Sequence, residues 1–325
     1  MAEAAALNLI IALISVFAIV FSAEKVVDKM GAVARSFGVS EVFIAITLVS
    51  LGTSLPEISV HIVGSLSIIS DPSLMQSISA TVLGMNIGSD IVQQTFVMGS
   101  VIALAAFLRS QDSVVFTRKF ITRDYIPMIG AHLLVFLLAL NGFLTRWEGF
   151  VLISAFLIYL YYIYGRREEV LLKQGDGEES EKPYLDLLIG VVAITVLIYS
   201  SVVFLSIVEI VVAETGVSGS MIGVATVGIV SALPEMVTAF TALRQRAEGL
   251  ALGTLIGSNI TNPLVGIGLG ASISGYSVPR SLLVFDLPVQ VGADVFLILY
   301  LWNRDCDGGM LGSTAKKIHL EQTPK

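Results

Sequence analysis

The chain has 325 residues, of which 55% are hydrophobic and 14% are charged, and its formal net charge is −7. Its mean hydropathy of +0.85 is typical of a polytopic membrane protein and excludes a soluble domain. No nucleic-acid-binding signature is present, and the single cysteine, Cys306, excludes a disulfide framework.

The apolar segments are long enough to cross a hydrocarbon core of about 30 Å, which takes about 20 helical residues. We treat the first as retained, because no basic residue precedes it as in a cleaved signal. Nine spans are predicted, at approximately 5–22, 39–68, 75–107, 125–142, 147–165, 184–212, 218–243, 249–272 and 283–302.

The distribution of Lys and Arg predicts the orientation, because these residues concentrate in cytoplasmic loops. With the N-terminus outside, only Arg146 and Arg280 fall on the outer side, and the C-terminus is cytoplasmic. This places the protein in the cell membrane as a multi-pass protein. The ranges divide into a first transmembrane repeat (1–165), a cytoplasmic linker loop (166–183), a second repeat (184–302) and a polar cytoplasmic tail (303–325).

Two motifs occur once in each half. Leu55-Pro56-Glu57 in the second span recurs as Leu233-Pro234-Glu235 in the seventh, and the match extends back at one constant offset to Gly38 and Gly216. Ile87-Gly88-Ser89 in the third span recurs as Ile256-Gly257-Ser258 in the eighth. Because five spans separate the copies, the repeats have inverted topology, which is common in secondary transporters with a midplane substrate site.

Glu57 and Glu235 are therefore expected to face each other, and a carboxylate at bilayer depth is a functional-site hypothesis in itself. A hard cation such as Ca²⁺ takes about six to eight oxygen ligands, including carboxylates and carbonyls. Each proline removes a helical hydrogen bond and disturbs the carbonyl four residues earlier, so distortions are predicted at Gly52 and Val230.

The Gly-Ser motifs add polar side chains on the following spans. Ser89 and Gln93 lie one helical turn apart, as do Ser258 and Asn262, so each pair is expected to line the same cavity. Small residues behind them are expected to allow close helix packing: Gly84, Gly88, Gly253 and Gly257.

These motifs resemble those of the sodium/calcium exchanger family, in its prokaryotic type, within the cation/calcium exchanger superfamily. Gly52-Thr53-Ser54-Leu55-Pro56-Glu57 matches the first family signature, and the resemblance covers all nine spans. It implies an all-α antiporter of inverted repeats that exchanges Ca²⁺ for Na⁺ by alternating access. No cofactor is implied, and the expected partners are inorganic cations and the lipid bilayer, with no obligatory protein partner.

The resemblance also implies which residues bind cations. Glu57 and Glu235 would be the principal Ca²⁺ ligands, and Gln93 and Asn262 occupy the two central polar positions. The hydroxyls implied for the Ca²⁺ or Na⁺ sites are those of Thr53, Ser54, Ser89, Ser231 and Ser258.

Three departures bear on the coupling ion. Gln93 and Asn262 stand where an Asn and an Asp are usual, and Ala232 stands where a Ser is usual. Two carboxylates are balanced by one Ca²⁺, two Na⁺ or two protons, so a divalent cation/proton antiporter stays open, as does a Mg²⁺ or Mn²⁺ substrate. The family usually has five spans per half, whereas five and then four are predicted here.

Other polar residues have alternative interpretations. Asp90 adjoins Ser89 but points about 100° away on a helix, so it is either part of the site or an interhelical hydrogen-bonding group. His61 follows Glu57 by one turn and could tune its proton affinity. His132 is predicted to be an interhelical hydrogen-bonding histidine.

Two other functional classes are less compatible with the sequence. An intramembrane enzyme would need a nucleophile with its base or a metal-binding histidine cluster, and neither appears. A passive channel would suit the same polar residues, but inverted halves suit alternating access better.

Overall fold

The computed structural model describes residues 2–108, 118–169, 179–214 and 231–301, and these residues are almost entirely helical. Within them, the bent pair Glu41–Thr53 and Leu55–Ser70 can form one span. Seven further helices are long and apolar enough to cross a membrane, namely Leu7–Ser36, Pro72–Ala105, Ile121–Ala139, Arg146–Tyr164, Pro183–Phe204, Glu248–Ser274 and Leu282–Leu301.

Eight of the nine predicted spans therefore have a counterpart. The seventh, 218–243, is described only from residue 231, where it contains α12 (Leu233–Arg244). The polar tail 303–325 and residues 170–178 of the linker loop lie outside the described residues.

Short irregular segments interrupt the spans. In the first half the elements are α1 (Ala2–Ser36), α2 (Glu41–Ile44), η1 (Ala45–Val49), α3 (Ser50–Thr53), α4 (Leu55–Ser70), η2 (Pro72–Leu74), α5 (Met75–Val92), η3 (Gln93–Val97), α6 (Met98–Leu108), α7 (Arg118–Phe120), η4 (Ile121–Tyr125), α8 (Ile126–Ala139), β1 (Phe143–Leu144) and α9 (Arg146–Tyr164). In the second half they are α10 (Pro183–Glu214), α12, α13 (Glu248–Thr261), η5 (Asn262–Ile267), α14 (Gly268–Ser274), β2 (Tyr276–Ser277) and η6 (Leu282–Asp286), which opens the Leu282–Leu301 helix.

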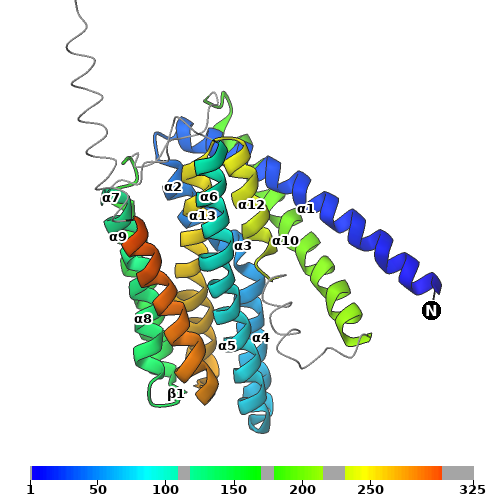
Figure 1. Ribbon diagram of the computed structural model, residues 1–325, viewed down its shortest axis with the longest axis vertical. Helices are drawn as coiled ribbons and strands as arrows, with labels where there is room; N and C mark the ends of the chain where they lie inside the picture. The colour runs from blue at the N-terminus through cyan, green and yellow to red at the C-terminus, as the bar shows by residue number, and fades with distance from the viewer. Residues whose placement is uncertain (1, 109–117, 170–178, 215–230, 302–325) are drawn as a thin grey trace, which may run out of the picture.

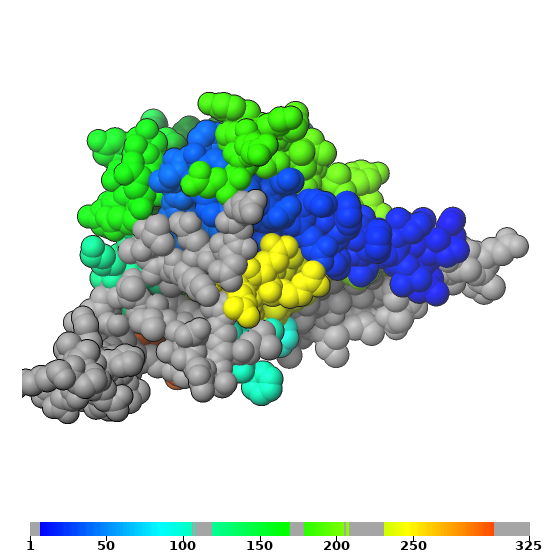
Figure 2. Space-filling view, turned by 90° about the horizontal axis from the view of Figure 1, so that it is seen from above, coloured from blue at the N-terminus to red at the C-terminus, as the bar shows by residue number. Residues whose placement is uncertain are grey.

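Helix α1 is much longer than the predicted span 5–22, since it continues to Ser36. Its charged second part is stabilised by partners on other elements: Lys29 lies 2.9 Å from Asp186 of α10, and Glu24 pairs with Arg244 of α12. Figure 1 shows α1 and α10 side by side, slanting away from the other helices. From above, α1 extends outward with the end of α12, in yellow, beside it (Figure 2).

Each Pro-Glu motif begins a new helix after a break. Ser54 leaves helical geometry with φ −81° and ψ 0°, and Ala232, at the same repeat position, has φ −78° and ψ 0°. In the first half the axis bends by 46° at this break. The sequence placed the distortion at Gly52, two residues too early, because Pro56 is accommodated in the first turn of α4. Val230 lies outside the described residues.

The second repeat supplies the centre of the molecule. Of the most apolar part of the Glu248–Ser274 segment, 94% is buried. A Cβ at Gly253 would lie 2.7 Å from Ala45 Cβ, and one at Gly257 would lie 2.4 Å from Ser50 Oγ, so both glycines allow the predicted close packing. For Gly84 and Gly88, no described atom lies within 4 Å of such a Cβ, so close packing there stays a prediction.

The irregular segments repeat with the same symmetry. Gln93 begins the π-helical turn η3 and Asn262 begins η5, at the same repeat position, and η4 and η6 form a second such pair. Isolated π-helical turns inside α-helices are frequent at functional sites. The inverted repeat is therefore visible in backbone detail as well as in sequence.

Candidate cation site

Both glutamates of the repeated motif are buried, with Glu57 1% and Glu235 0% exposed. They lie near enough for their carboxylates to repel each other if both are charged. Each sits in the first turn of the helix after the break, where the positive end of the helix dipole favours a carboxylate. The two helix starts thus bring two acidic groups into one buried region.

A chain of hydroxyls joins the two halves at this region. Ser54 Oγ lies 3.2 Å from Ser258 Oγ, and Ser258 donates to Glu235 Oε1 at 3.2 Å. Thr53, also fully buried, makes a second polar contact with Glu235. The structure therefore groups three other predicted site residues around the Glu235 carboxylate.

Several buried oxygens of the site have no hydrogen-bond donor among the described residues. They are Glu57 Oε1, Glu57 Oε2, Glu235 Oε2 and Asn262 Oδ1. An acceptor buried without a donor costs free energy, and a carboxylate costs more than an amide. A cation bound between these oxygens would remove that cost.

A cavity of about 40 Å³ opens beside the glutamates. Glu57 and Ser231 line it, together with both motif prolines, Pro56 and Pro234. About 10–15 Å³ is enough for one water-sized sphere, so the cavity has room for an ion with a water ligand. Its α10 wall contains Ser201, which the sequence analysis did not single out.

The central amides, Gln93 and Asn262, each contact a residue of the other repeat in a reciprocal way. Asn262 Nδ2 donates to Asp90 Oδ1 at 2.9 Å, and Asn259 Nδ2 donates to Gln93 Oε1 at 3.2 Å. Asp90 and Asn259 occupy one repeat position, whereas Gln93 and Asn262 occupy another. Each pair therefore repeats the other with the halves exchanged, as a two-fold axis between the repeats requires.

Within the first half, Gln93 Nε2 donates to Ser89 Oγ at 3.2 Å, as expected for two residues one turn apart. All ten residues implied by the sequence are thus in the interior, nine of them fully buried and Ser231 partly so.

Asp90 also connects the site to a second polar cluster. Its Oδ2 accepts from Gln290 Nε2 at 3.2 Å and lies 3.9 Å from His132 Nε2. His132 Nδ1 lies 2.7 Å from Asp294 Oδ2, and Gln94 Nε2 lies 3.2 Å from the same ring nitrogen. His132 is the predicted interhelical histidine, and Asp90 makes the predicted interhelical hydrogen bonds.

The sequence analysis missed Gln94, Gln290 and Asp294, all of which are buried. Asp294 carried a usable signal, since an acid within a predicted span is a functional or pairing candidate by default. Gln94 and Gln290 carried none, because nothing in the motifs distinguishes them.

His61 does not bond to Glu57 in this structure. Its Nδ1 lies 3.1 Å from the Tyr276 hydroxyl and its Nε2 lies 3.0 Å from Asn86 Nδ2. Ser65 also bonds to the Tyr276 hydroxyl, at 2.8 Å. The histidine thus ties α4 to α5 and β2.

Across the part of the chain described by the structure, no three side chains of His, Cys, Asp or Glu are grouped so as to hold a metal ion. A cation between Glu57 and Glu235 would therefore depend on neutral oxygens for its remaining ligands. This suits a transported ion, which must leave the site, better than a permanently held one.

From the contacts of Asp90 we predict that it positions Asn262. Its carboxylate holds the Asn262 amide by its NH₂ group, which leaves Asn262 Oδ1 free to face a cation. Asp90→Ala would leave two buried donors without an acceptor, at about 1–3 kcal/mol each. We expect the apparent affinity for a divalent cation to fall about tenfold, corresponding to about 1.4 kcal/mol.

Cation binding measured by calorimetry on the purified protein checks this expectation. Asp90→Asn keeps one acceptor oxygen, so its cation affinity should lie between those of wild type and Asp90→Ala. Equal affinities for all three proteins would show that Asp90 does not position Asn262.

The fold and the grouped residues define a class of protein: a helical membrane transporter of two inverted repeats. The family profile described as "Sodium/calcium exchanger protein" matches residues 7–165 and 185–306. The chain belongs to the sodium/calcium exchanger family.

Named relatives agree with this chain in length, and a solved structure agrees with it in fold. The chain is 25% identical to "Sodium/calcium exchanger MaX1" of Methanosarcina acetivorans, covering 90% of this chain and 91% of that one. It is 26% identical to "Putative antiporter CaxA" of Alkalimonas amylolytica, covering 89% and 88%. A structure of the sodium-calcium exchanger NCX_Mj soaked with 100 mM Na⁺ and 10 mM Sr²⁺ superposes with a TM-score of 0.74, at 20% identity over 98% of this chain and 99% of that chain.

Proposed function

We propose that this protein exchanges Ca²⁺ for Na⁺ across the cell membrane by alternating access, at a cation site built on Glu57 and Glu235. The observation that carries the proposal is the meeting of the two motif segments. Three of the four carboxylate oxygens there have no hydrogen-bond donor among the described residues. Two facing carboxylates in an apolar interior attract a divalent cation and disfavour an empty, fully charged site.

The neutral ligands come from the same neighbourhood. Asn262 Oδ1 and the hydroxyls of Ser54 and Ser258 offer oxygens between the halves, and Thr53 and Ser231 offer them at the two helix breaks. Gln93 and Ser89, which are hydrogen-bonded to each other, extend this polar surface. These uncharged oxygens fit Na⁺ as well as Ca²⁺, so the two ions would compete for overlapping positions.

The repeat geometry supports alternating access. Because the two halves enter the membrane from opposite sides, a site on their two-fold axis can open to either side by the same movement of equivalent helices. The positive-inside bias supports an orientation in the membrane with the N-terminus outside and residues 166–183 in the cytoplasm. The named activity of MaX1, sodium/calcium exchange, supports Na⁺ as the coupling ion.

A divalent cation/proton antiporter is the alternative, and one feature favours it. Asn262 stands where the family usually has an Asp, so the site has two carboxylates, which two protons or one divalent ion neutralise equally. The same charge count permits Mg²⁺ or Mn²⁺ as the substrate.

Uptake of Ca²⁺ into proteoliposomes distinguishes these functions. The purified protein is reconstituted, and uptake driven by an outward Na⁺ gradient is compared with uptake driven by an outward proton gradient at matched membrane potential. We expect the Na⁺ gradient to drive uptake. Uptake with the proton gradient alone would establish the alternative, and competition by Mg²⁺ or Mn²⁺ in the same assay identifies the preferred divalent ion.

A further inference from the structure

A buried amide beside His61 has its oxygen free. The Asn86 side chain, on α5, is fully buried, and its Oδ1 has no hydrogen-bond partner among the described residues. Its Nδ2, by contrast, makes two contacts: it lies 3.0 Å from His61 Nε2 and 3.2 Å from the backbone oxygen of Asn262. The amino group of Asn86 is therefore held in place, while its oxygen is left without a donor.

The surrounding contacts decide which end of the amide carries the oxygen. The backbone oxygen of Asn262 only accepts hydrogen bonds, so the Asn86 atom beside it is the nitrogen. His61 Nε2 then accepts from the same nitrogen, and His61 Nδ1 carries the ring proton and donates to the Tyr276 hydroxyl, 3.1 Å away. The Tyr276 hydroxyl donates to Ser65 Oγ at 2.8 Å, because the Ser65 proton goes to a backbone oxygen of α14. Every donor in this chain is used, and the Asn86 oxygen is an acceptor left over.

The Asn86 amide lies on the Glu57 side of the cation site. His61 follows Glu57 by one helical turn, so both side chains leave the same face of α4, and Asn86 contacts that face. The Glu235 carboxylate has a serine and a threonine as polar neighbours, whereas neither oxygen of Glu57 has a donor among the described residues. The free oxygens near Glu57 thus include two amide oxygens, those of Asn86 and Asn262.

The second repeat has no counterpart of this amide. At the same repeat positions, Leu255 corresponds to Asn86 and Ala239 corresponds to His61, so an apolar pair replaces the hydrogen-bonded one. The two motif glutamates are therefore related by the repeat but differ in their neutral neighbours, with hydroxyls beside Glu235 and amides beside Glu57. Such a difference suits two cation positions with different ligands.

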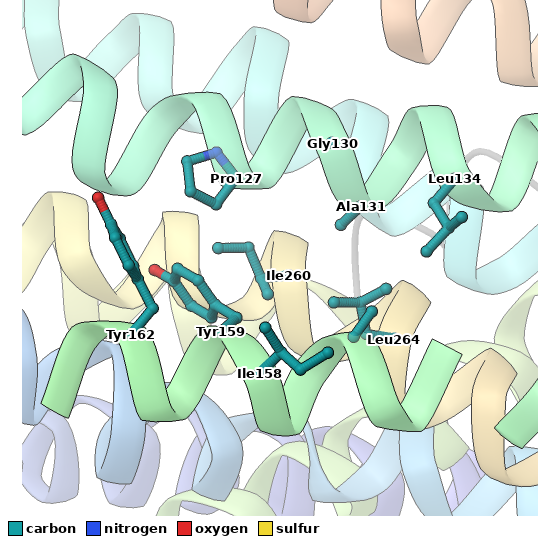
Figure 3. Close-up of a pocket in the computed structure, with 10 residues that line it drawn as sticks. Pro127, Gly130, Ala131, Leu134, Ile158, Tyr159, Tyr162, Ile260 and Leu264 are labelled. Carbon is teal, nitrogen blue, oxygen red and sulfur yellow. The ribbon is translucent and has the colours of Figure 1, made fainter. Parts of the chain in front are cut away.

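The π-helical turn η5 approaches the amide closely. Its Leu264 lines an apolar pocket of about 360 Å³ between α8 and α9, so the opposite side of the turn faces α4 and α5 (Figure 3). Gly266 lies on that side, where a Cβ would lie 3.1 Å from His61 Cδ2 and 3.2 Å from Asn86 Nδ2. Both contacts would be tight, so the glycine lets the three elements meet around the Asn86 side chain.

We propose that Asn86 Oδ1 is a further ligand of the cation site, where it binds Na⁺ together with Glu57 and Asn262 Oδ1. His61 is then a positioning residue, because it holds the amino group of Asn86 and so directs the oxygen. Two carboxylates are neutralised by one Ca²⁺ or by two Na⁺, and two Na⁺ need two sets of oxygens. A neutral amide adds a ligand for the second ion without adding charge. The inference rests on the proposed exchange of Ca²⁺ for Na⁺ and names a ligand for the coupling ion.

Displacement of Ca²⁺ by Na⁺ tests this assignment. Radioactive Ca²⁺ is bound to the purified protein, and the Na⁺ concentration that displaces half of it is measured while choline chloride keeps the ionic strength constant. For Asn86→Ala we expect this Na⁺ concentration to rise about tenfold, while the Ca²⁺ affinity without Na⁺ stays within about twofold of wild type. The retained Ca²⁺ affinity shows in the same experiment that the variant is folded.

Ser79→Ala is the matched control on the same helix. Ser79 is fully buried and accepts a hydrogen bond from Ser277 N at 3.2 Å, so its loss weakens the contact between α5 and β2 without touching the amide. This variant should bind both ions as wild type does.

Two substitutions of His61 give a second test that leaves Asn86 itself intact. His61→Ala frees the amide to turn, whereas the side-chain oxygen of His61→Gln can still accept from it. We therefore expect His61→Ala to need more Na⁺ than His61→Gln for the same displacement of Ca²⁺. Equal Na⁺ requirements of these two variants would overturn the positioning role of His61.

The remaining outcomes separate this assignment from the proposed function. An unchanged Na⁺ requirement in Asn86→Ala, or an equal loss of affinity for both ions, would overturn Asn86 as a Na⁺ ligand while leaving Na⁺ coupling in place. If Na⁺ does not displace Ca²⁺ from wild type, the proposed Na⁺ coupling fails, and the role of Asn86 fails with it.

Discussion

Glu57→Gln and Glu235→Gln are each expected to reduce Na⁺-driven Ca²⁺ uptake into proteoliposomes at least 100-fold. Each change removes one of the two charges that would hold the divalent ion at the proposed site. Breaking a buried charge interaction by removing one partner costs about 3–5 kcal/mol, and 1.4 kcal/mol is a factor of ten in affinity. Uptake is measured with radioactive Ca²⁺ at equal protein density.

The control removes a carboxylate outside the site. Glu168 has an exposed side chain in the loop after α9, so Glu168→Gln should transport at the wild-type rate. Uptake at that same rate by both glutamate variants would exclude the proposed site.

Thermal unfolding distinguishes a lost site from a misfolded protein. Without cations, Glu57→Gln should unfold at the same or a higher temperature than wild type, since both carboxylate oxygens of Glu57 are buried without donors. Added Ca²⁺ should stabilise wild type but not the variant, because only binding to the folded state raises its stability. A variant that unfolds much earlier without cations would indicate a structural role for Glu57.

The sequence predicted the grouping of residues well where a motif repeats. The Pro-Glu steps and the Gly-Ser motifs each occur twice, so their meeting could be inferred from the inverted repeat alone. The grouping of Ser54, Ser258 and Glu235 agrees with that inference. The membership of the exchanger family, also inferred from these residues, is confirmed.

The contact partners of Asp294 and Gln290 could not be predicted from sequence, because neither residue belongs to a repeated motif. Their importance comes from tertiary contact: they lie on the Leu282–Leu301 helix and reach His132 and Asp90 on other spans. Asp90, the third acid near the site, thus contacts the central amide Asn262 from another span, whereas the position of that amide itself is not acidic. Hydropathy alone reports a buried polar residue but not the partner that satisfies it.

The predicted boundaries of α1 were wrong for a related reason. A hydropathy window ends the span before Glu24, yet the helix continues to Ser36 because tertiary ion pairs such as Lys29–Asp186 accept the charges. The helix break was predicted at Gly52 but lies at Ser54, and the reason for this difference is local. A proline predicts that a helix is interrupted, but the first turn tolerates it, so the interruption falls just before that turn.

Gly149→Leu is expected to abolish recovery of folded, monodisperse protein. The side chain would point at backbone atoms of α14, 2.3 Å from Ser272 N and 2.6 Å from Gly268 O at its Cβ, and the backbone of a packed helix cannot move aside as a flexible side chain can. Even Gly149→Ala must separate α9 from α14, and overpacking of this kind costs about 1–3 kcal/mol. Its melting temperature, measured by fluorescence in detergent, should fall by about 5 °C.

Gly130→Ala is the matched control for this effect. Gly130 lies within α8, where an added Cβ meets no described atom within 4 Å, and alanine favours the helix over glycine by about 1 kcal/mol. Its melting temperature should therefore stay the same or rise. If Gly149→Ala has the same melting temperature as Gly130→Ala, α9 and α14 separate freely. The packing of the first repeat on the second then does not depend on this contact. If Gly149→Ala instead melts early but transports normally once reconstituted, the contact stabilises the bundle without taking part in the movement of the halves.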